Sequence, residues 1–235
     1  MKAFFITTVC ISLAAACTSR PEVTKPLTQE EKVRLNLDSL KRVAAPGDVV
    51  VRAGDDLLSY QIKFLNEVDK TYSHAGMIVE RDGQKMVAHI TPDDSTRDGV
   101  QYIPIDSFLS PVRNLSCALY RYTSPNFDGG KMAAVVEGYR QAGVRFDRVY
   151  DLATDNFLYC SEMISKALAQ ATAGNITIKE TGVPKAMQKT VYLYFQKKLS
   201  PAVIAERRII TVDNLYRHPA CSLIMSFLLK HLPGQ

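Results

Sequence analysis

Residues 73–91 carry the clearest structural signal in the chain and read Ser-His-Ala-Gly-Met-Ile-Val-Glu-Arg-Asp-Gly-Gln-Lys-Met-Val-Ala-His-Ile-Thr. An Asp-Gly pair at 82–83 separates two runs in which apolar side chains recur, and Asp-Gly favours a two-residue hairpin turn. The sequence therefore predicts two antiparallel strands, over residues 73–80 and 85–91.

Two histidines fall on the same face of this predicted hairpin. Since side chains alternate along a strand, the register set by the turn makes His74 and His89 diagonal neighbours, with Cα atoms about 7–8 Å apart. Gly76 lies opposite His89 and is expected to leave open space on that face. One imidazole can orient the other, which is the base-and-orienter part of a nucleophilic site.

Cys160 is the candidate nucleophile because it begins a predicted helix over residues 160–171. A helix N-terminus and a nearby imidazolium both favour a thiolate, so we expect a depressed pKa for Cys160. Core packing, or one half of a disulfide, is the alternative role for a cysteine on an apolar helix. Glu162, in the first helical turn, is expected to complement the helix dipole.

The remaining pattern alternates helices and strands. A capping box at Thr28 and Glu31 opens a helix predicted over residues 29–43. Apolar periodicity and turn residues predict the other elements: helices over 57–68 and 128–142, strands over 48–52, 100–105, 115–122 and 209–212, and a loop over 143–158.

The N-terminus is a targeting segment. Lys2 precedes a run without charge, Ala3 to Ala16, and Cys17 follows directly. This layout resembles a bacterial lipoprotein signal, in which the cysteine becomes the lipidated first residue; plain secretion with cleavage near Ala16 is the alternative. We expect a signal peptide over residues 1–16, a tether over 17–27 and a single domain over 28–235.

Composition excludes several classes of protein. The chain has 235 residues, 46% hydrophobic and 23% charged, which is ordinary for a globular domain and excludes a mainly disordered chain. The excess of 29 basic over 24 acidic residues is too small to indicate nucleic-acid binding. No apolar run reaches the roughly 18 residues that would span a bilayer.

Three cysteines remain in the predicted domain, and sequence alone does not pair them. A bridge between Cys117 and Cys221 would leave Cys160 free. The chain has no CxxC or HExxH motif, so we expect neither a structural metal nor a cofactor. Zinc held by His74, His89 and Cys160 is the main chemical alternative to a hydrolytic triad.

Three motifs, in this order, carry a resemblance to a known family: Gly47-Asp48-Val49-Val50, Ser73-His74-Ala75-Gly76-Met77 and Tyr159-Cys160-Ser161-Glu162-Met163. They look like the permuted papain-like cysteine hydrolases of the NlpC/P60 superfamily, and most of all its YiiX/YebB-like group. Residues 143–159 also resemble the family's approach to its cysteine. The resemblance implies an α+β fold, a circularly permuted papain-like core with an antiparallel sheet or barrel packed against helices.

The same resemblance implies roles for individual residues. Cys160 corresponds to the nucleophile and His74 to the general base. The third, polar residue falls on the strand after the base, where this chain has His89 and many members of the group have Glu. A His at this place occurs in relatives, including the lecithin:retinol acyltransferase-like proteins. Tyr159, or backbone N–H groups near Cys160, are the candidates for the oxyanion hole.

We therefore expect a lipid-anchored cysteine hydrolase in the bacterial cell envelope, facing the periplasm, with the outer membrane as one location. Its expected substrate is an amide bond in peptidoglycan peptides, and its other expected partner is the membrane that holds its lipid. One alternative keeps the triad and makes the chain a lipid acyl hydrolase or acyltransferase. Another is a non-enzymatic envelope binding protein. The sequence leaves the oligomeric state open.

Overall fold

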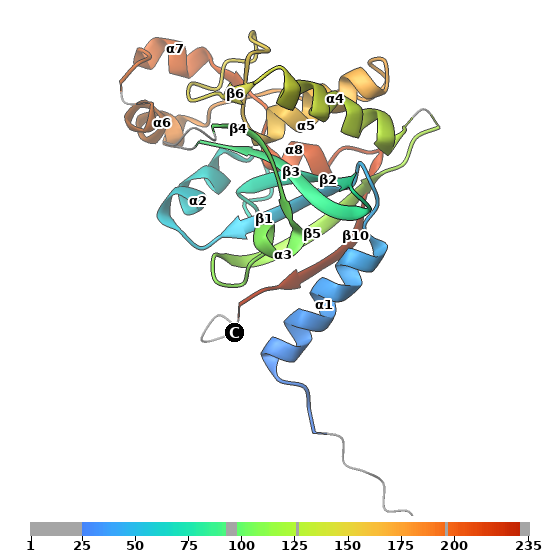
Figure 1. Ribbon diagram of the computed structural model, residues 1–235. Helices are drawn as coiled ribbons and strands as arrows, with labels where there is room; N and C mark the ends of the chain where they lie inside the picture. The colour runs from blue at the N-terminus through green and yellow to red at the C-terminus, as the bar shows by residue number, and fades with distance from the viewer. Residues whose placement is uncertain (1–24, 93–97, 126, 196, 231–235) are drawn as a thin grey trace, which may run out of the picture.

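A six-stranded antiparallel sheet forms the centre of the computed structural model, which describes residues 25–92, 98–125, 127–195 and 197–230. Its strand order is β10-β5-β1-β2-β3-β4 (Figure 1). The strands are β1 (Val49–Gly54), β2 (His74–Arg81), β3 (Gln84–Thr91), β4 (Gly99–Pro104), β5 (Asn114–Tyr122) and β10 (Cys221–Leu228). Two short pairs flank this sheet, β6 (Arg145–Phe146) with β7 (Phe157–Leu158), and β8 (Thr181–Gly182) with β9 (Arg208–Ile209).

Helices cover both faces of the sheet, and the alternation of strand residues creates two cores. In β1, Val49 and Val51 join one buried cluster and Val50 joins the other. The smaller cluster lies under α1 (Gln29–Val43) and α3 (Ile105–Phe108). The larger cluster includes α4 (Gly129–Gln141), α5 (Cys160–Ala171) and α8 (Val212–Tyr216). The chain thus has the predicted α+β architecture, an antiparallel sheet packed with helices.

The remaining helices are short. Near the end of β1 and the start of β2 lie α2 (Leu57–Ile62) and the 3-10 turn η1 (Lys63–Leu65). The turn η2 (Lys185–Met187) leads into α6 (Gln188–Tyr194), and α7 (Pro201–Glu206) follows. In Figure 1, α6 and α7 lie together at one end of the molecule, and α1 lies at the other.

The hairpin and the first helix confirm their predictions. In the hairpin, Arg81 pairs with Gln84 and Met77 with Ala88, which is the predicted register. Asp82 and Gly83 both have positive φ angles, 52° and 72°, as a two-residue turn of this kind requires. Helix α1 covers the predicted residues, and its capping box forms between Thr28 and Glu31.

Three predictions about secondary structure are corrected. The helix expected over 57–68 is shorter and consists of α2 followed by η1, which ends at Leu65. The Asp213 carboxylate accepts the N–H groups of residues 67–69 and holds them in a turn. The strand expected over 209–212 contributes only Ile209, since α8 begins at Val212. The loop expected over 143–158 contains β6 and β7.

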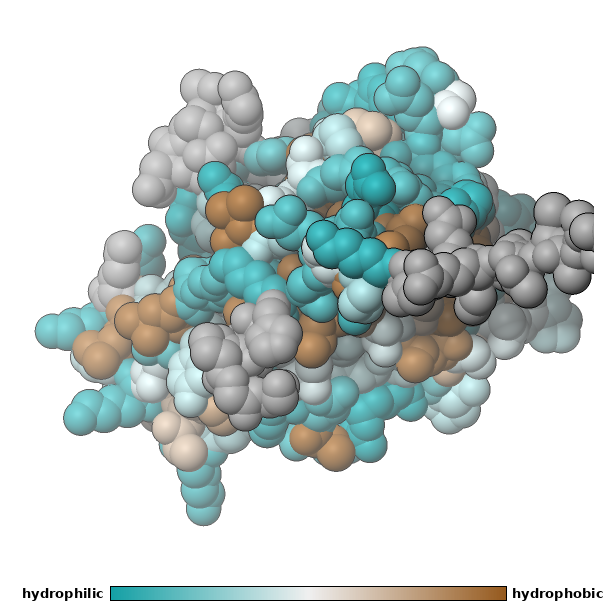
Figure 2. Space-filling view, turned by 90° about the horizontal axis from the view of Figure 1, so that it is seen from below, coloured by the Kyte–Doolittle hydropathy of each residue, from teal (hydrophilic) through white to brown (hydrophobic). Residues whose placement is uncertain are grey.

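Strand β10 was absent from the prediction and forms one edge of the sheet. It pairs with β5 and carries no charged residue, and Leu223, Ile224 and Leu228 are exposed on it. On the face seen in Figure 2, exposed apolar side chains form separate groups among polar ones. The described residues visible on this face therefore form no continuous apolar patch.

The suggested bridge between Cys117 and Cys221 does not form. On the β5–β10 pair, Cys117 lies opposite Phe227, whereas Cys221 lies opposite Tyr122. Residues this far apart along paired strands exceed the roughly 7 Å between Cα atoms that a disulfide allows. Both cysteines are free, as is Cys160.

Gly76 does not leave the open space that the sequence suggested. A Cβ atom at this position would lie 2.4 Å from Cγ1 of Val87 and 3.2 Å from Cζ of Phe108. The face that carries the histidines is therefore filled by the aromatic ring of α3.

A close contact between two glycines seats helix α4 against the turn before β1. Gly47 has a φ of +88°, and a Cβ atom on it would lie 2.5 Å from the Cα of Gly129. A Cβ on Gly129 would lie 1.8 Å from the carbonyl oxygen of Pro46. Neither position accepts a side chain without movement of the backbone.

We predict that Gly129→Ala lowers the free energy of unfolding by about 1–3 kcal/mol, because the added methyl group collides with a backbone carbonyl. Gly138→Ala is the matched control in the same helix, since nothing lies within 4 Å of its Cβ position. The control should raise the free energy of unfolding by up to about 1 kcal/mol. Urea titration of both variants measures this, and equal effects would contradict the close contact.

Candidate active site

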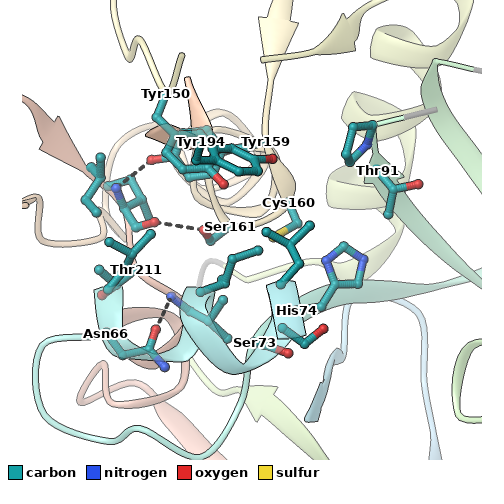
Figure 3. Close-up of a pocket in the computed structure, with 18 of the residues that line it drawn as sticks. Asn66, Ser73, His74, Thr91, Tyr150, Tyr159, Cys160, Ser161, Tyr194 and Thr211 are labelled. Atoms are coloured by element: carbon teal, nitrogen blue, oxygen red, sulfur yellow. Dashed lines mark hydrogen bonds between the residues drawn. The ribbon is translucent and has the colours of Figure 1, made fainter. Parts of the chain in front are cut away.

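One cleft brings together the residues that the sequence singled out for chemistry. Cys160 and His74 both line it, and its cavity volume is about 170 Å³. Figure 3 shows the Cys160 sulfur and the His74 ring on the same side of the cleft, across from the tyrosine cluster. The apolar and aromatic lining consists mainly of Leu58, Ile62, Phe146, Tyr150, Tyr194 and Val212, and the polar lining of Arg52, Asp56, Asn66, Ser73 and Thr211.

Cys160 is the first residue of α5, as predicted. Tyr159 before it has extended backbone angles, φ −103° and ψ 172°, and its N–H donates to Oε2 of Glu162 at 3.3 Å. The helix therefore begins at a defined point and directs its free N–H groups toward the cleft.

The cysteine meets the open end of the hairpin. Strand β2 continues to His74, but its ladder with β3 ends at Met77 and Ala88. Beyond that point the backbone N–H groups of Ala75 and Ser161 act on the Cys160 sulfur and favour its thiolate. The separation of β2 from β3 thus leaves a backbone donor for the sulfur.

Burial nevertheless raises the pKa of Cys160. The two N–H groups and the positive charge of Arg52 act in the opposite direction, but they do not outweigh the loss of water. The expectation of a depressed pKa was therefore wrong in direction. The cysteine rests as a neutral thiol at neutral pH.

The two histidines are in direct contact, as the register predicted. Nε2 of His74 lies 3.2 Å from Nδ1 of His89, and the two rings are nearly perpendicular, at 85°. One ring must donate and the other accept. Because Nε2 of His74 faces His89, its Nδ1 is the nitrogen left for another partner.

Both imidazoles are neutral at neutral pH. Burial lowers the pKa of His74 well below its ordinary value, and the charges of Arg52 and His89 add to this. Burial and Arg52 lower the pKa of His89 to about 4. Nε2 of His89 is buried and has no hydrogen-bond partner among the described residues.

The ring of Phe108 supports this pair from α3. Its centroid lies 5.6 Å from that of His74 and 5.4 Å from that of His89. The guanidinium of Arg52 lies over the same ring, 4.5 Å from its centroid. The ring of Phe108 therefore packs against both imidazoles, and their orientation does not depend on one hydrogen bond alone.

Tyr159, the predicted oxyanion candidate, lines the cleft beside Cys160. Its hydroxyl accepts a hydrogen bond from the N–H of Ile210 at 2.6 Å, which Figure 3 shows as a dashed line. Its ring packs against that of Tyr150, with centroids 4.6 Å apart. The hydroxyl keeps its own proton, and its part in stabilising an oxyanion stays a prediction.

Glu162 has a structural role, as expected. Its carboxylate binds the N–H of Tyr159 and lies 3.0 Å from Nζ of Lys166. Lys166 also donates to the carbonyl oxygens of Leu152 and Thr154. Burial raises the pKa of Glu162 to about 7, against the effect of Lys166. This cluster ties the loop before the cysteine to the helix that follows it.

The far wall of the cleft is built by long-range contacts that sequence reasoning missed. Oδ1 of Asn66 accepts the N–H of Val212 at 3.1 Å, and the Asp213 carboxylate accepts the N–H of Val68 at 2.7 Å. These bonds join the turn after η1 to the first turn of α8. The only local signal was the appearance of Asn and Asp beside predicted element ends, which is typical of turns in general.

Arg52 was also missed as a site residue. It follows the apolar run Val49–Val51, and a charged residue at this place is typical of the exposed end of a strand. In the structure it pairs with His74 across β1 and β2, and it lines the cleft. A charged residue that interrupts an otherwise buried strand was the signal that could have identified it.

The remaining expectations concern the lipid anchor, membrane-spanning helices and metal sites. Cys17, the signal peptide and most of the tether lie before residue 25, outside the described ranges. In the part of the chain that the structure describes, no helix is long and apolar enough to cross a membrane. Within those same ranges, no three His, Cys, Asp or Glu side chains are grouped so as to hold a metal ion.

Comparison with known proteins identifies relatives of this fold. A family model described as "Permuted papain-like amidase enzyme, YaeF/YiiX, C92 family" matches residues 43–225. Among solved structures, the chain is similar to that of metalloprotein yiiX from Escherichia coli O157:H7, with a TM-score of 0.60 and 18% identity. That match covers 77% of this chain and 97% of the other. No curated protein matches the sequence.

The family match spans the hairpin, both histidines and the cysteine, and the structural match shows the same permuted papain-like fold. The sequence resemblance to the YiiX group is thereby confirmed. The chain belongs to the YaeF/YiiX (C92) family of permuted papain-like amidases and is a cysteine hydrolase.

Proposed function

We propose that this chain is a lipid-anchored hydrolase of the bacterial envelope that cleaves amide bonds in peptidoglycan peptides, with Cys160, His74 and His89 as its triad. The single observation that supports this most is the 3.2 Å contact of His89 with His74, the imidazole that lines the same cleft as the Cys160 thiol. Nucleophile, base and orienting group are then all present in one place.

The geometry suggests which nitrogen performs each step. His74 donates through Nε2–H to Nδ1 of His89, so its Nδ1 carries a lone pair that accepts the thiol proton. The Cys160 sulfur attacks the carbonyl carbon as this proton leaves. His74 then protonates the leaving amine, and the C–N bond breaks to leave a thioester. Water, deprotonated by His74, attacks the thioester, and the acid departs with the thiol restored.

The neutral resting state fits this order of events. Since the pKa of His74 is lowered, its base form persists into mildly acidic solution. Since the pKa of Cys160 is raised, the thiol gives up its proton only during attack. The base therefore acts on each turnover instead of maintaining a permanent ion pair.

Several donors are available for the oxyanion. The N–H groups of Ala75 and Ser161 already face the sulfur and are fixed by the backbone. Tyr159 has one hydroxyl proton in the same cleft. Fixed backbone donors need little reorganisation during the reaction, so we favour the two N–H groups and keep Tyr159 as the third.

One observation favours a second candidate function, hydrolysis or transfer of a lipid acyl group. A smaller apolar depression adjoins the cleft and shares Leu58, Ile62, Leu65, Tyr150 and Tyr194 with it, extending the lining to Met187 and Val191. An acyl chain is the kind of group that such a surface would hold. The chemistry at Cys160 would be the same, with an ester or thioester in place of the amide.

We predict that Cys160→Ala lowers hydrolysis of purified peptidoglycan peptides about a thousandfold or more, because the nucleophile is lost. Mass spectrometry of the products measures this. Cys221→Ala is the matched control, since its thiol lies on β10 away from the cleft, and it should retain activity. Full activity of Cys160→Ala would overturn the mechanism. Release of fatty acid from lipid esters, with intact peptides, would replace the proposal by the second candidate.

For the histidines, we predict that His74→Ala abolishes turnover, whereas His89→Gln lowers kcat/KM about 10- to 100-fold because the base loses its orienting partner. In the parent protein the acid limb of kcat/KM should lie below pH 6.5, because His74 must be neutral and its pKa is lowered. His89→Gln removes one cause of that lowering, so the limb should move to higher pH. An unchanged limb with full activity would exclude His89 from the triad.

We also predict that Cys17→Ser releases the protein from the membrane fraction or leaves its precursor unprocessed, because the lipid has no attachment site. Cys10→Ser is the matched control, since this residue lies in the segment expected to be removed. Fractionation and the mass of the mature N-terminus measure both. A soluble, unlipidated mature chain with Cys17 intact would disprove the anchor.

A further inference from the structure

Arg52 is a positive charge beside the catalytic groups that the proposed mechanism does not use. It lies opposite His74 on the neighbouring strand, and its side chain lines the cleft together with Cys160. Its location within the sheet is fixed on both sides, since β1 also pairs it with Cys117 of β5. The guanidinium is therefore held at a set distance from the reacting groups.

Most hydrogen-bond donors of the Arg52 guanidinium have no acceptor among the described residues. Nη1 donates to the carbonyl oxygen of Phe108 at 2.9 Å, and the guanidinium rests on the ring of that residue. Nε is buried without a hydrogen-bond partner. Nη2 has no hydrogen bond to any described residue. A guanidinium has five N–H donors, and here one carbonyl oxygen is its only acceptor in the described ranges.

No carboxylate in the described part of the chain forms an ion pair with Arg52. The carboxylate that acts on it most is Asp56, also on the cleft wall, and among acidic groups only Cys160 acts on it more strongly. That carboxylate is already bound by the N–H and the hydroxyl of Ser59, at 2.9 and 2.7 Å. Arg113 adds a second positive charge nearby.

A largely buried cation without a counterion is costly, and proteins rarely keep one unless an anion meets it. Burial in fact lowers the pKa of Arg52, which shows that its charge is poorly compensated. The missing anion must then enter the cleft from outside. A substrate is the natural source, since Arg52 and Cys160 line the same cleft.

We propose that Arg52 binds a carboxylate of the substrate, so that the enzyme selects peptides with a free carboxylate next to the amide bond that Cys160 attacks. The selection of substrates for cleavage rests on the proposed amidase function, whereas the binding of a carboxylate by Arg52 does not. A planar guanidinium matches a carboxylate with two parallel N–H···O bonds. A neutral analogue would leave the cation unpaired, so discrimination against it should be strong.

Binding can be measured without turnover in the Cys160→Ala protein. The probes are N-acetylglutamate, its uncharged diamide (N-acetylglutamine amide) and methyl phosphate, followed by calorimetry or by chemical shifts. We expect N-acetylglutamate to bind at least about tenfold more tightly than the amide, and Arg52→Met to remove the difference. Equal binding of acid and amide, or no binding of either, would overturn the proposal. Tighter binding of methyl phosphate would assign the site to a phosphate instead.

Two variants keep this test interpretable. Arg52→Met retains an apolar side chain over Phe108, and the Phe108 carbonyl keeps the hydrogen bond from Asn114 at 3.2 Å, so the fold should survive. Unfolding curves check this directly. Arg113→Met removes an exposed nearby cation that does not line the cleft, and it should leave the preference for N-acetylglutamate intact.

Kinetics of active protein then separate the subsite from the reaction. For two muropeptides that differ only in a carboxylate or a carboxamide beside the scissile amide, Arg52→Met should raise KM about tenfold or more for the acid alone. An equal loss of kcat for both would show that Arg52 stabilises the thiolate or oxyanion and would overturn the proposal. If neither muropeptide is cleaved but the binding preference holds, the proposed function fails and the subsite stands.

Discussion

The incomplete pairing of β2 with β3 is the constraint on which the site depends. The hairpin is closed at its turn by a full ladder, and it opens at its other end, beyond Met77 and Ala88. That opening frees the N–H of Ala75, brings both imidazoles to one place and receives the first turn of α5. A hairpin paired along its whole length would satisfy its own backbone and leave no donor for the sulfur. The unpaired end of the hairpin is thus what allows it to contribute groups to the candidate active site.

Around this opening, burial keeps the thiol and both imidazoles of the proposed triad uncharged. Burial raises the pKa of the thiol and lowers that of both histidines, and Arg52 strengthens the second effect. Arg52 acts on the thiol in the other direction, yet burial prevails. The site therefore differs from a preformed thiolate–imidazolium pair. In the proposed mechanism, reaction depends on proton transfer between neutral partners, which requires the ring positions that Phe108 and His89 support.

The sequence predicted the parts of this site that local chemistry determines. Asp82 and Gly83 set the turn, the turn set the register, and the register brought His74 to His89. The sequence also predicted correctly that α5 begins at Cys160. What the sequence could not show depends on distant contacts, such as the bonds from Asp213 that shorten α2 and the ring of Phe108 that fills the space beside Gly76. The direction of the Cys160 pKa shift was missed for the same reason, since burial is a property of the assembled fold.

The neutral thiol has a consequence for survival in an oxidising environment. Peroxides and disulfides react with thiolates far faster than with thiols, and repeated oxidation carries a cysteine to sulfinic and sulfonic acids that are not recovered. A nucleophile that stays protonated between turnovers spends little time in the vulnerable form. Cys117 is buried, so it too is sheltered from exchange. A neutral Cys160 would therefore allow the proposed nucleophile to stay reduced without a disulfide partner to restore it.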